Sequence, residues 1–284
     1  MMTMAKQDDG ESLPRAAHPT AKAFFDALDS RSSNIKQSAA LKRRSLSLGW
    51  RNRHSQDEYY PVSIGSTNFS VLQVQRGEVE GTYGTGATVW PAAMVLIKYM
   101  EKNPSLIAGK RVVDLGSGTS VTSVAAAILG ASHVTCTDGE ENVVLLAHDN
   151  VNHVVDQIVG CKKSSEESPS AVIQNCPVLV HKYWWGDGTV QGVCDVVLVA
   201  DCVLPKLYPI APLVQAIDEL LKTPSALAIL SYEHRYYPEY DPRDKFRELA
   251  TARGLQVEQV SPENMDPVFC LDDIEVWHVK RSDM

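Results

Sequence analysis

The segment that most constrains the fold reads VVDLGSGTS, from Val112 to Ser120. A β-branched run ends at a carboxylate, turns on Gly116 and Gly118, and continues at once into the apolar string VTSVAAAIL. A buried strand, a glycine turn and a helix in this order are typical of a doubly wound α/β sheet, in which ligands bind beyond the carboxyl ends of the strands. The segment therefore predicts a parallel sheet and the edge of it at which a ligand would bind.

Strands and helices alternate along the rest of the chain. The strand centres are apolar throughout, which indicates a sheet covered by helices on both faces. The pattern predicts seven core strands, at residues 111–115, 132–138, 171–184, 194–201, 225–233, 255–260 and 273–281. It predicts helices at residues 89–104, 120–130, 140–151, 207–221 and 241–254. Residues 68–75 form an extra amino-terminal strand in this interpretation.

Composition limits the partners and the location of the chain. Its 284 residues carry 35 acidic and 27 basic side chains, a net charge of −8, so no nucleic acid partner is expected. No apolar run approaches the roughly 18–20 residues of a membrane span and the first residues lack a secretory leader, so no membrane partner is expected either. Six scattered cysteines without a C-x-x-C pair suggest a reducing compartment, which predicts a cytoplasmic location, with the nucleus as a second one. We expect a monomer.

The amino-terminal region differs from the rest in charge. From Met1 to Arg53 there are ten Lys and Arg against five Asp and Glu, and much of the segment is rich in serine. This composition predicts a basic, largely flexible extension over residues 1–60, with a short helix at 21–30, followed by one domain over residues 61–284. The hydroxyl of Ser45 beside basic residues is a candidate phosphorylation site.

The glycine turn carries information about its ligand. A dinucleotide-binding turn reads G-x-G-x-x-G, whereas Val121 stands where the third glycine would be. Asp114 precedes the turn and would repel a pyrophosphate but attract an ammonium group, and Asp138 ends the next strand, where a carboxylate can accept hydrogen bonds from ribose. No Lys or Arg occurs between Val112 and Asn142. The turn therefore suits a nucleoside with an amine and no phosphate, such as S-adenosyl-L-methionine, although a tight turn without any ligand gives the same short motif.

Six motifs occur in a characteristic order: GTGATVWPAA, VVDLGSGTS, VTCTD, YWWGD, CDVVLVADCV and SYEHR. In this order they resemble the non-SET, seven-β-strand protein-lysine methyltransferases, the methyltransferase-like family sixteen, of the methyltransferase-like 21 type. The resemblance covers about residues 84–235 by motif. It implies a Rossmann-like seven-stranded class I methyltransferase sheet with S-adenosyl-L-methionine as cofactor. It also implies a protein substrate that is methylated on lysine, and chaperones and translation factors are among the targets of that family.

The resemblance also implies roles for individual residues. It assigns the cofactor site to Trp90, Gly116, Ser117, Gly118, Asp138, Trp185 and Ala200, to which the charge argument adds Asp114. The doubled Trp184 leaves the tryptophan register open by one residue. Asp201 would orient the acceptor amine, but Leu204 stands where the family motif D-x-x-Y has its tyrosine, so the aromatic wall falls to Tyr232 or to Tyr208. Ser120 replaces a third glycine and is expected to cap the following helix.

Several alternatives remain open from the sequence alone. The tryptophans could be ordinary packing residues, Asp201 could cap a helix, and Glu233 and Arg235 are expected to form an internal ion pair. The histidines show no metal-ligand spacing, so no metal is expected. The competing functions are an arginine or small-molecule methyltransferase, a nicotinamide-dependent oxidoreductase, and a non-catalytic interaction protein with a degenerate cofactor site.

Overall fold

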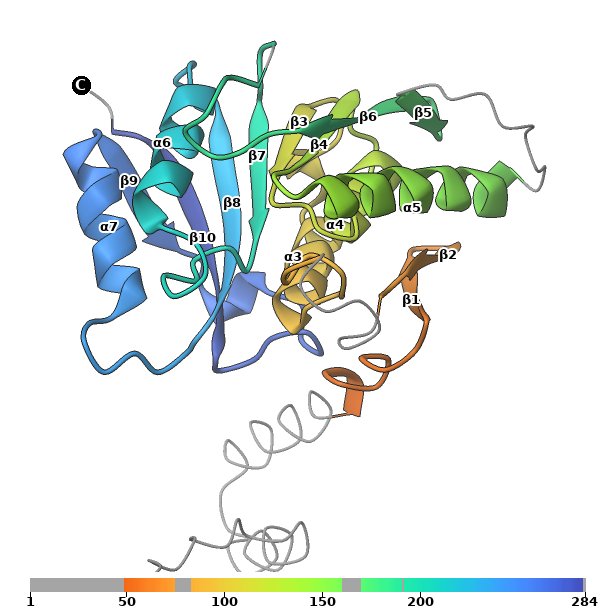
Figure 1. Cartoon of the computed structure of the whole chain (residues 1–284), viewed down its shortest axis with the longest axis horizontal. Coiled ribbons are helices and arrows are strands. Elements are labelled where there is room, and N and C mark those ends of the chain that lie inside the picture. Colours follow the sequence, from red (N-terminus) through yellow and green to blue (C-terminus); the bar gives the residue numbers. More distant parts are fainter. Residues whose placement is uncertain (1–48, 75–82, 160–169, 191, 283–284) are drawn as a thin grey trace, which may run out of the picture. The chain divides into compact units, whose positions relative to one another are not determined.

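The computed structural model describes residues 49–74, 83–159, 170–190 and 192–282 (Figure 1). The chain divides into two units, residues 1–42 and 43–284, and all described residues belong to the second. The expected helix at residues 21–30 and the candidate phosphorylation site at Ser45 lie outside the described residues.

An eight-stranded mixed sheet forms the centre of this unit, and it contains all seven predicted core strands. Its central strands run parallel, β10 pairs antiparallel with both β8 and β9, and β5 pairs antiparallel with β6 at the other edge. The order across the sheet is β5 (Ser170–Ile173), β6 (Cys176–Lys182), β4 (His133–Asp138), β3 (Arg111–Leu115), β7 (Val196–Ala200), β8 (Leu227–Glu233), β10 (Ile274–Arg281) and β9 (Leu255–Gln259). The predicted Rossmann-like sheet is confirmed, with one strand more than expected.

The additional strand comes from residues 171–184, which the sequence pattern predicts as a single strand. The structure instead folds this segment into the hairpin β5–β6, which turns at Gln174 and Asn175. Both turn residues have positive φ, 47° and 71°. Tight hairpin turns require positive φ at their central residues, a conformation that Asn tolerates better than most side chains, so this dipeptide breaks the strand.

A separate two-stranded hairpin, β1 (Tyr59–Ile64) with β2 (Thr67–Leu72), replaces the single amino-terminal strand expected at residues 68–75. Strand β1 alternates exposed and buried side chains, but Pro61 interrupts the sequence pattern, because proline is uncommon inside strands. Still earlier in the chain, Trp50 packs against Phe269 with ring centroids 4.5 Å apart. Trp50 therefore contacts a residue of the carboxyl-terminal part of the chain, although it lies within the extension that the composition predicts over residues 1–60.

Helices cover both faces of the sheet, as predicted. Alternate residues of the central strands enter opposite layers, so that Val112 packs in one hydrophobic cluster and Val113 in the other. The first cluster includes residues of α3 (Pro91–Lys102), α4 (Val121–Ile128) and α5 (Glu141–Val159), and the second includes residues of α6 (Ile210–Leu220) and α7 (Pro242–Ala252). Pro91 occupies the first turn of α3, the position where a missing N–H costs least.

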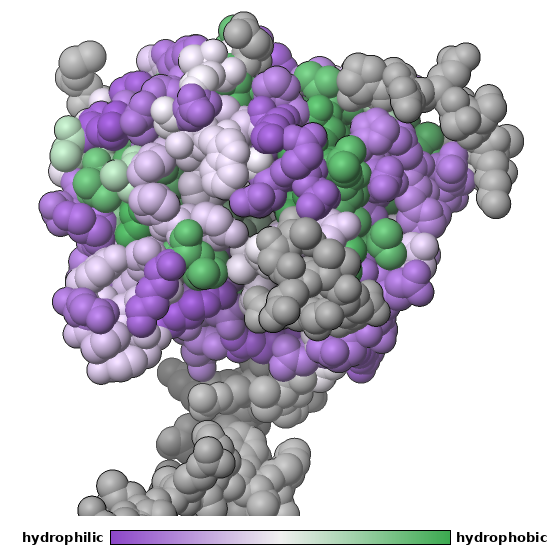
Figure 2. Space-filling model, viewed as in Figure 1, coloured by the Kyte–Doolittle hydropathy of each residue, from purple (hydrophilic) through white to green (hydrophobic). Residues whose placement is uncertain are grey.

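Polar side chains cover most of the face shown in Figure 2, and apolar side chains interrupt it in separate groups. The large exposed apolar residues are spread over several elements; among them are Leu145 on α5 and Tyr236 after β8. None of the helices in the described ranges has the length and apolar character needed to cross a bilayer.

Trp277 packs in the hydrophobic cluster between the sheet and helices α6 and α7. Its ring is fully buried on β10, stacks on Tyr232 at 5.1 Å and meets Phe246 at 5.4 Å between centroids.

We predict that Trp277→Ala lowers the free energy of unfolding by about 3–5 kcal/mol, because it leaves a large cavity. Urea denaturation followed by circular dichroism measures the loss. Leu145→Ala, at a side chain 56% exposed, is the control and should cost no more than about 0.5 kcal/mol. A loss below 1 kcal/mol for Trp277→Ala would contradict this packing.

Candidate functional site

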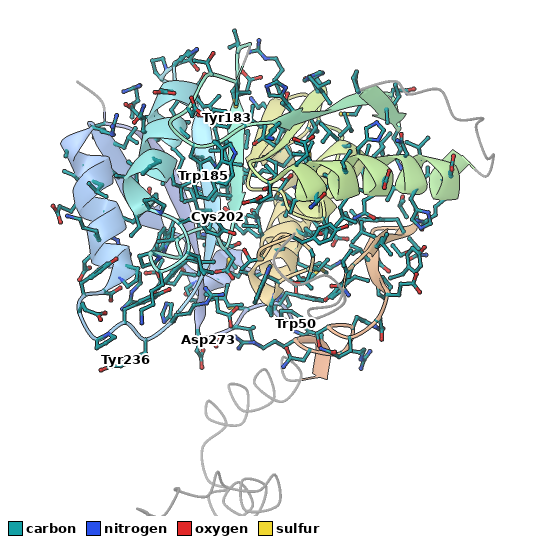
Figure 3. All side chains as sticks on the ribbon, viewed as in Figure 1. Trp50, Tyr183, Trp185, Cys202, Tyr236 and Asp273 are labelled. Atoms are coloured by element: carbon teal, nitrogen blue, oxygen red, sulfur yellow. The ribbon has the colours of Figure 1, made fainter. Side chains whose placement is uncertain are left out.

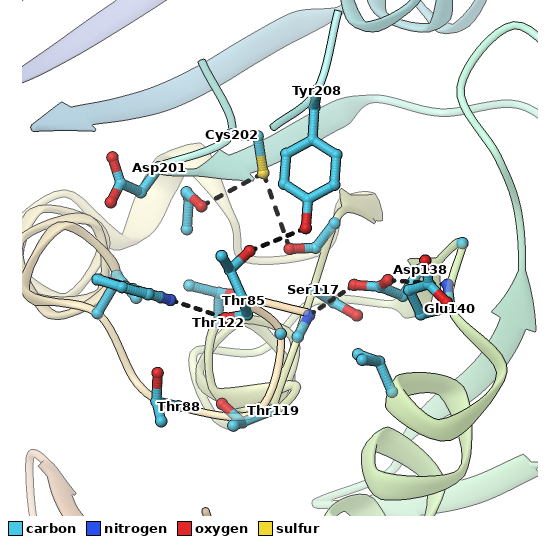
Figure 4. A pocket seen from close by; sticks show the side chains of 18 of the residues that line it. Thr85, Thr88, Ser117, Thr119, Thr122, Asp138, Glu140, Asp201, Cys202 and Tyr208 are labelled. Atoms are coloured by element: carbon cyan, nitrogen blue, oxygen red, sulfur yellow. Dashed lines mark hydrogen bonds between the residues drawn. The ribbon is translucent and has the colours of Figure 1, made fainter. Parts of the chain in front are cut away.

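A cavity opens at the carboxyl ends of the central strands (Figure 4), and the empty space within it and at its open mouth is about 840 Å³. It is lined by the glycine turn after β3, the loop after β4, the end of β7 with the residues that follow, and the segment 83–93 before and within α3. Parallel strands end at the same edge, so residues distant in sequence meet here. This position is typical of a site for a small organic ligand.

The glycine turn forms one wall of the cavity, as predicted. Gly116 and Gly118 have φ values of 68° and 54°, which L side chains rarely adopt. A Cβ at Gly116 would lie 2.8 Å from the Cys202 Sγ, and one at Gly118 would lie 2.9 Å from the Gly86 carbonyl oxygen. Ser117 also lines the cavity. The tight turn therefore permits close backbone approach between the strand ends and the segment before α3.

Ser120 corrects one expectation. It precedes α4 in the left-handed conformation, at φ 64°, and its side chain makes no capping hydrogen bond. Its hydroxyl instead donates to the Ala147 carbonyl oxygen at 3.2 Å. The left-handed conformation costs an L residue roughly 1–2 kcal/mol, which explains why glycine suits this position in the family that the sequence resembles.

Asp138 lies at the end of β4 and lines the cavity, as predicted. Its carboxylate accepts hydrogen bonds from the Gly118 N–H at 3.1 Å and the Glu140 N–H at 3.3 Å. Burial raises the pKa of this carboxyl group, and the backbone N–H donors oppose that rise. A carboxylate held in this way can accept further hydrogen bonds from the hydroxyls of a ribose.

Asp114 does not face the cavity, contrary to the expectation that it would attract a ligand ammonium directly. The side chain is fully buried and accepts hydrogen bonds on Oδ2 from Thr122 at 2.5 Å and Ser123 at 2.7 Å, whereas Oδ1 has no hydrogen-bond partner among the described residues. Because Thr122 lines the cavity, it separates Asp114 from any ligand there. Burial is the main cause that raises the pKa of Asp114 to about 6, against the opposing hydroxyl bonds.

The opposite side of the cavity carries the second predicted carboxylate. Figure 4 shows Asp201 across the cavity from Asp138. Asp201 follows β7 with φ 57°, is 4% exposed, and pairs with Arg235, whose nearest nitrogen lies 2.5 Å away. Ala200 and Trp90 line the cavity beside it, and the Trp90 Nε1–H donates to the Thr85 carbonyl oxygen at 2.9 Å.

Tyr232 is not part of this cavity, although the sequence interpretation assigns it the aromatic wall. It is 1% exposed and stacks on Trp277 in the core. Tyr208 lines the cavity instead, and its hydroxyl lies 2.9 Å from the Thr85 hydroxyl. A hydrogen bond from the Tyr208 N–H to the Leu204 carbonyl oxygen forms one helical turn, which brings the tyrosine beside the position that the motif leaves without one.

Both tryptophans of the YWWGD motif line the cavity, so the structure does not single out Trp184 or Trp185 as the one that matches the family motif. Trp185 meets Tyr208 edge-on at 5.8 Å and lies over Gly116, and Figure 3 shows it near Cys202. Trp184 covers Gly139, where a Cβ would lie 2.6 Å from its ring. Motif positions alone do not assign three of the lining residues. Trp184 is left open because either tryptophan of the motif could be the one that matches. Tyr208 and Thr85 are brought together by a contact between loops.

The charges around the cavity favour a cationic or neutral ligand. The described lining residues include the carboxylates of Asp138, Glu140 and Asp201, but no Lys, Arg or His. A pyrophosphate would meet net negative charge here, which argues against a dinucleotide. Within the described ranges, no three His, Cys, Asp or Glu side chains are grouped so that they could hold a metal ion.

Comparison with known proteins agrees with this geometry. A sequence profile described as lysine methyltransferase matches residues 69–246. Protein N-lysine methyltransferase METTL21A of Danio rerio is 34% identical over 157 residues, which cover 54% of this chain and 63% of that protein. Protein-lysine N-methyltransferase EFM3 of Chaetomium thermophilum is 28% identical over 197 residues, which cover 68% of this chain and 54% of that protein. The chain thus spans less than two-thirds of the length of either relative.

Among solved structures, the T. thermophilus 16S rRNA N2 G1207 methyltransferase in complex with AdoMet and guanosine is similar with a TM-score of 0.47. Its sequence identity is 14%, and the match covers 79% of this chain and 50% of that chain.

The burial of Asp114 predicts a measurable pH dependence. The folded protein holds the pKa of this carboxyl group near 6, above its ordinary value of 3.8, so the protonated form stabilises the fold. That stabilisation is complete below about pH 4 and is lost as the pH rises through about 6. We expect Asp114 to contribute roughly 1–3 kcal/mol to the difference in unfolding free energy between pH 4 and pH 7. Urea denaturation at both pH values measures this difference, and Asp114→Asn should remove the contribution.

Asp149→Asn, at an exposed carboxylate on α5, is the control for this measurement and should leave the pH dependence unchanged. If Asp114→Asn and the wild type lost stability in parallel between pH 4 and pH 7, the raised pKa of Asp114 would be wrong.

Proposed function

The chain belongs to the lysine methyltransferase family, and from that premise we propose that it transfers a methyl group from S-adenosyl-L-methionine to a lysine side chain of a protein. The observation that carries this proposal is a single cavity with a ribose-type carboxylate, Asp138, on one side and a second carboxylate, Asp201, across from it. The absence of basic side chains among its described lining residues supports a sulfonium cofactor over a phosphorylated one.

The residues present fit this cofactor. Asp138 would accept hydrogen bonds from the ribose hydroxyls, and the turn over Gly116, Ser117 and Gly118 allows the ligand to approach the backbone closely. Helix α4 begins at Val121, which lines the cavity, so the positive end of its dipole favours the α-carboxylate.

The aromatic and small residues of the cavity complete this assignment. Trp184 and Trp185 provide apolar surface for adenine, and Ala200 leaves room beside them. When bound, S-adenosyl-L-methionine would supply a methyl group on a positively charged sulfur. The amine nitrogen bonds to the methyl carbon in line with the breaking carbon–sulfur bond, so that the thioether is released. The methylated ammonium later loses a proton to water.

The acceptor side must present a neutral amine. A free lysine has a pKa near 10.4, so at pH 7 only about one in 10³ to 10⁴ molecules has the lone pair required for attack. Asp201 would orient the amine, and Tyr208 and Trp90 would enclose its alkyl stem and exclude water. This arrangement gives Tyr208 the place of the tyrosine missing at Leu204.

The proposal includes the substrate and its location. Because both named relatives are protein-lysine methyltransferases, we propose a protein substrate. From the family resemblance of the motifs we further propose that it is a chaperone or a translation factor. We further propose that the chain acts as a monomer, in the cytoplasm and also in the nucleus. Methylation of arginine or of a small molecule is the competing outcome, and residue-level mass spectrometry of the labelled product distinguishes the three acceptors.

The direct test is methyl transfer to protein. The purified chain and radiolabelled S-adenosyl-L-methionine are incubated with a cell extract, and the labelled band is mapped by mass spectrometry. We predict label on lysine with the wild type and a loss of about 10²-fold or more with Asp201→Asn, because the amine is no longer oriented. Asparagine is chosen because it tolerates the left-handed conformation at this position. Label on arginine, or undiminished transfer by Asp201→Asn, would refute the assigned acceptor or the role of Asp201.

Asp138 gives a separate test of the cofactor assignment. We predict that Asp138→Ala weakens binding of S-adenosylhomocysteine by about 10-fold to 100-fold, the value of hydrogen bonds to one charged group. Isothermal titration calorimetry measures this affinity. Asp149→Ala, at a carboxylate exposed on α5, is the matched control. Equal affinities of Asp138→Ala and the wild type would remove Asp138 from the cofactor site.

A further inference from the structure

Asp201, the carboxylate on the acceptor side of the cavity, is already neutralised by a fixed partner. Arg235 binds both of its oxygens, with Nη1 at 2.7 Å from Oδ1 and Nη2 at 2.5 Å from Oδ2. The Asp201 side chain is 2% exposed and that of Arg235 is 27% exposed. A two-pronged pair of this kind is strong and fixes the orientation of both groups.

A second acid, Glu233, also pairs with Arg235, at a longer distance than Asp201. Glu233, two residues earlier, is the other acid within reach, but its Oε1 accepts a hydrogen bond from Arg51, and its Oε2 lies 3.7 Å from Arg235. Arg51 also pairs with Asp273, with Nη1 2.6 Å from Oδ2. Figure 3 shows Asp273 at the same end of the domain as Trp50. Glu233 thus pairs with both Arg51 and Arg235, as the sequence predicts for Arg235, and the shorter contacts of Arg235 are those with Asp201.

Arg235 is not among the lining residues of the cavity, but it contacts two of them, Trp90 and Asp201. Its guanidinium carbon is 6.0 Å from the centroid of the Trp90 ring, and both Trp90 and Asp201 line the cavity. Burial lowers the pKa of Arg235, but the hydrogen bond and charge of Asp201 and the charge of Glu233 outweigh that effect and raise it. Tyr237 is the remaining titratable group that acts on it. Arg235 therefore stays positively charged at every pH at which the protein is folded.

The pairing bears on a chemical difficulty. An unpaired carboxylate beside the acceptor amine would stabilise the ammonium form, which has no lone pair for attack. A carboxylate whose charge is cancelled can still accept a hydrogen bond from a neutral amine. Resting on the proposed function, we propose that Arg235 is a positioning residue that cancels the charge of Asp201, so that Asp201 orients the acceptor lysine without favouring its protonated form.

The test uses two cofactor analogues and needs no protein substrate. Sinefungin carries a primary ammonium group where S-adenosyl-L-methionine carries its methyl group, whereas S-adenosylhomocysteine carries nothing there. The ratio of their dissociation constants, measured by isothermal titration calorimetry at pH 7, therefore reports the charge at the acceptor position. We expect Arg235→Gln to favour sinefungin over S-adenosylhomocysteine by about tenfold relative to the wild type, because it exposes the Asp201 charge.

A set of variants separates this effect from a structural one. Asp201→Asn should shift the ratio about tenfold in the opposite direction, because it leaves the Arg235 charge unbalanced, and the double variant should return close to the wild-type ratio. Arg235→Lys keeps the charge and should keep the ratio. Arg243→Gln is the matched control: Arg243 pairs with Asp241 and Glu275 and is not among the lining residues of the cavity. Its ratio should equal that of the wild type.

The outcomes are distinct. Opposite shifts for Arg235→Gln and Asp201→Asn support the inference, and if Arg235→Gln does not fold, Asp201→Asn and Arg235→Lys still test it. A ratio within twofold of the wild type in both Arg235→Gln and Asp201→Asn, with both analogues bound, would overturn the inference and leave the methyltransferase proposal standing. If the wild type bound neither analogue, the proposed function would fall and the inference with it.

Discussion

The parallel pairing of β3 with β4 on one side and β7 on the other is the constraint on which the site depends. In this register Asp114 lies beside Cys136 of β4 and Leu198 of β7, so the three strands end at one edge. The glycine turn directly follows β3, Asp138 is the last residue of β4, and Asp201 directly follows β7. A slip of one residue in any pair would turn every side chain of that strand to the opposite face. The sheet thus assembles, from three separate segments, a cavity that none of them could form alone.

Charge is distributed unevenly within that cavity, and each acid has a different environment. Asp138 is held by backbone N–H groups and remains open to a ligand, whereas Asp114 is buried behind Thr122. Asp201 carries its own counter-ion, Arg235. In the proposed function, one residue type therefore serves a ligand contact, a buried structural contact and a neutralised acceptor contact, and the neighbouring residues determine which role each aspartate has. Methyl transfer requires this separation, because a sulfonium attracts carboxylates generally but an amine must stay neutral.

The positions of the central strands and of the glycine turn could be predicted from the sequence, because apolar runs and punctuating glycines are local signals. The directions of side chains could be predicted only in part. Residues two apart on a strand share a face, so Tyr232 follows Leu230 into the core beside α6 and α7. Val112 belongs to the layer of α4, and the same alternation turns Asp114 toward Thr122 on that helix. Both corrections follow from strand periodicity once the strand faces are known, whereas the place of Tyr208 depends on a loop contact with Thr85 that no local pattern records.

In the proposed complex, the cavity holds S-adenosyl-L-methionine with its ribose at Asp138 and its methyl group toward Asp201. The most direct measurement is a crystal structure of the chain with S-adenosylhomocysteine. The account predicts ribose hydroxyls within hydrogen-bond distance of the Asp138 carboxylate and the thioether sulfur on the side of Asp201 and Tyr208. An empty cavity, or a cavity that binds a nicotinamide dinucleotide in preference, would contradict it.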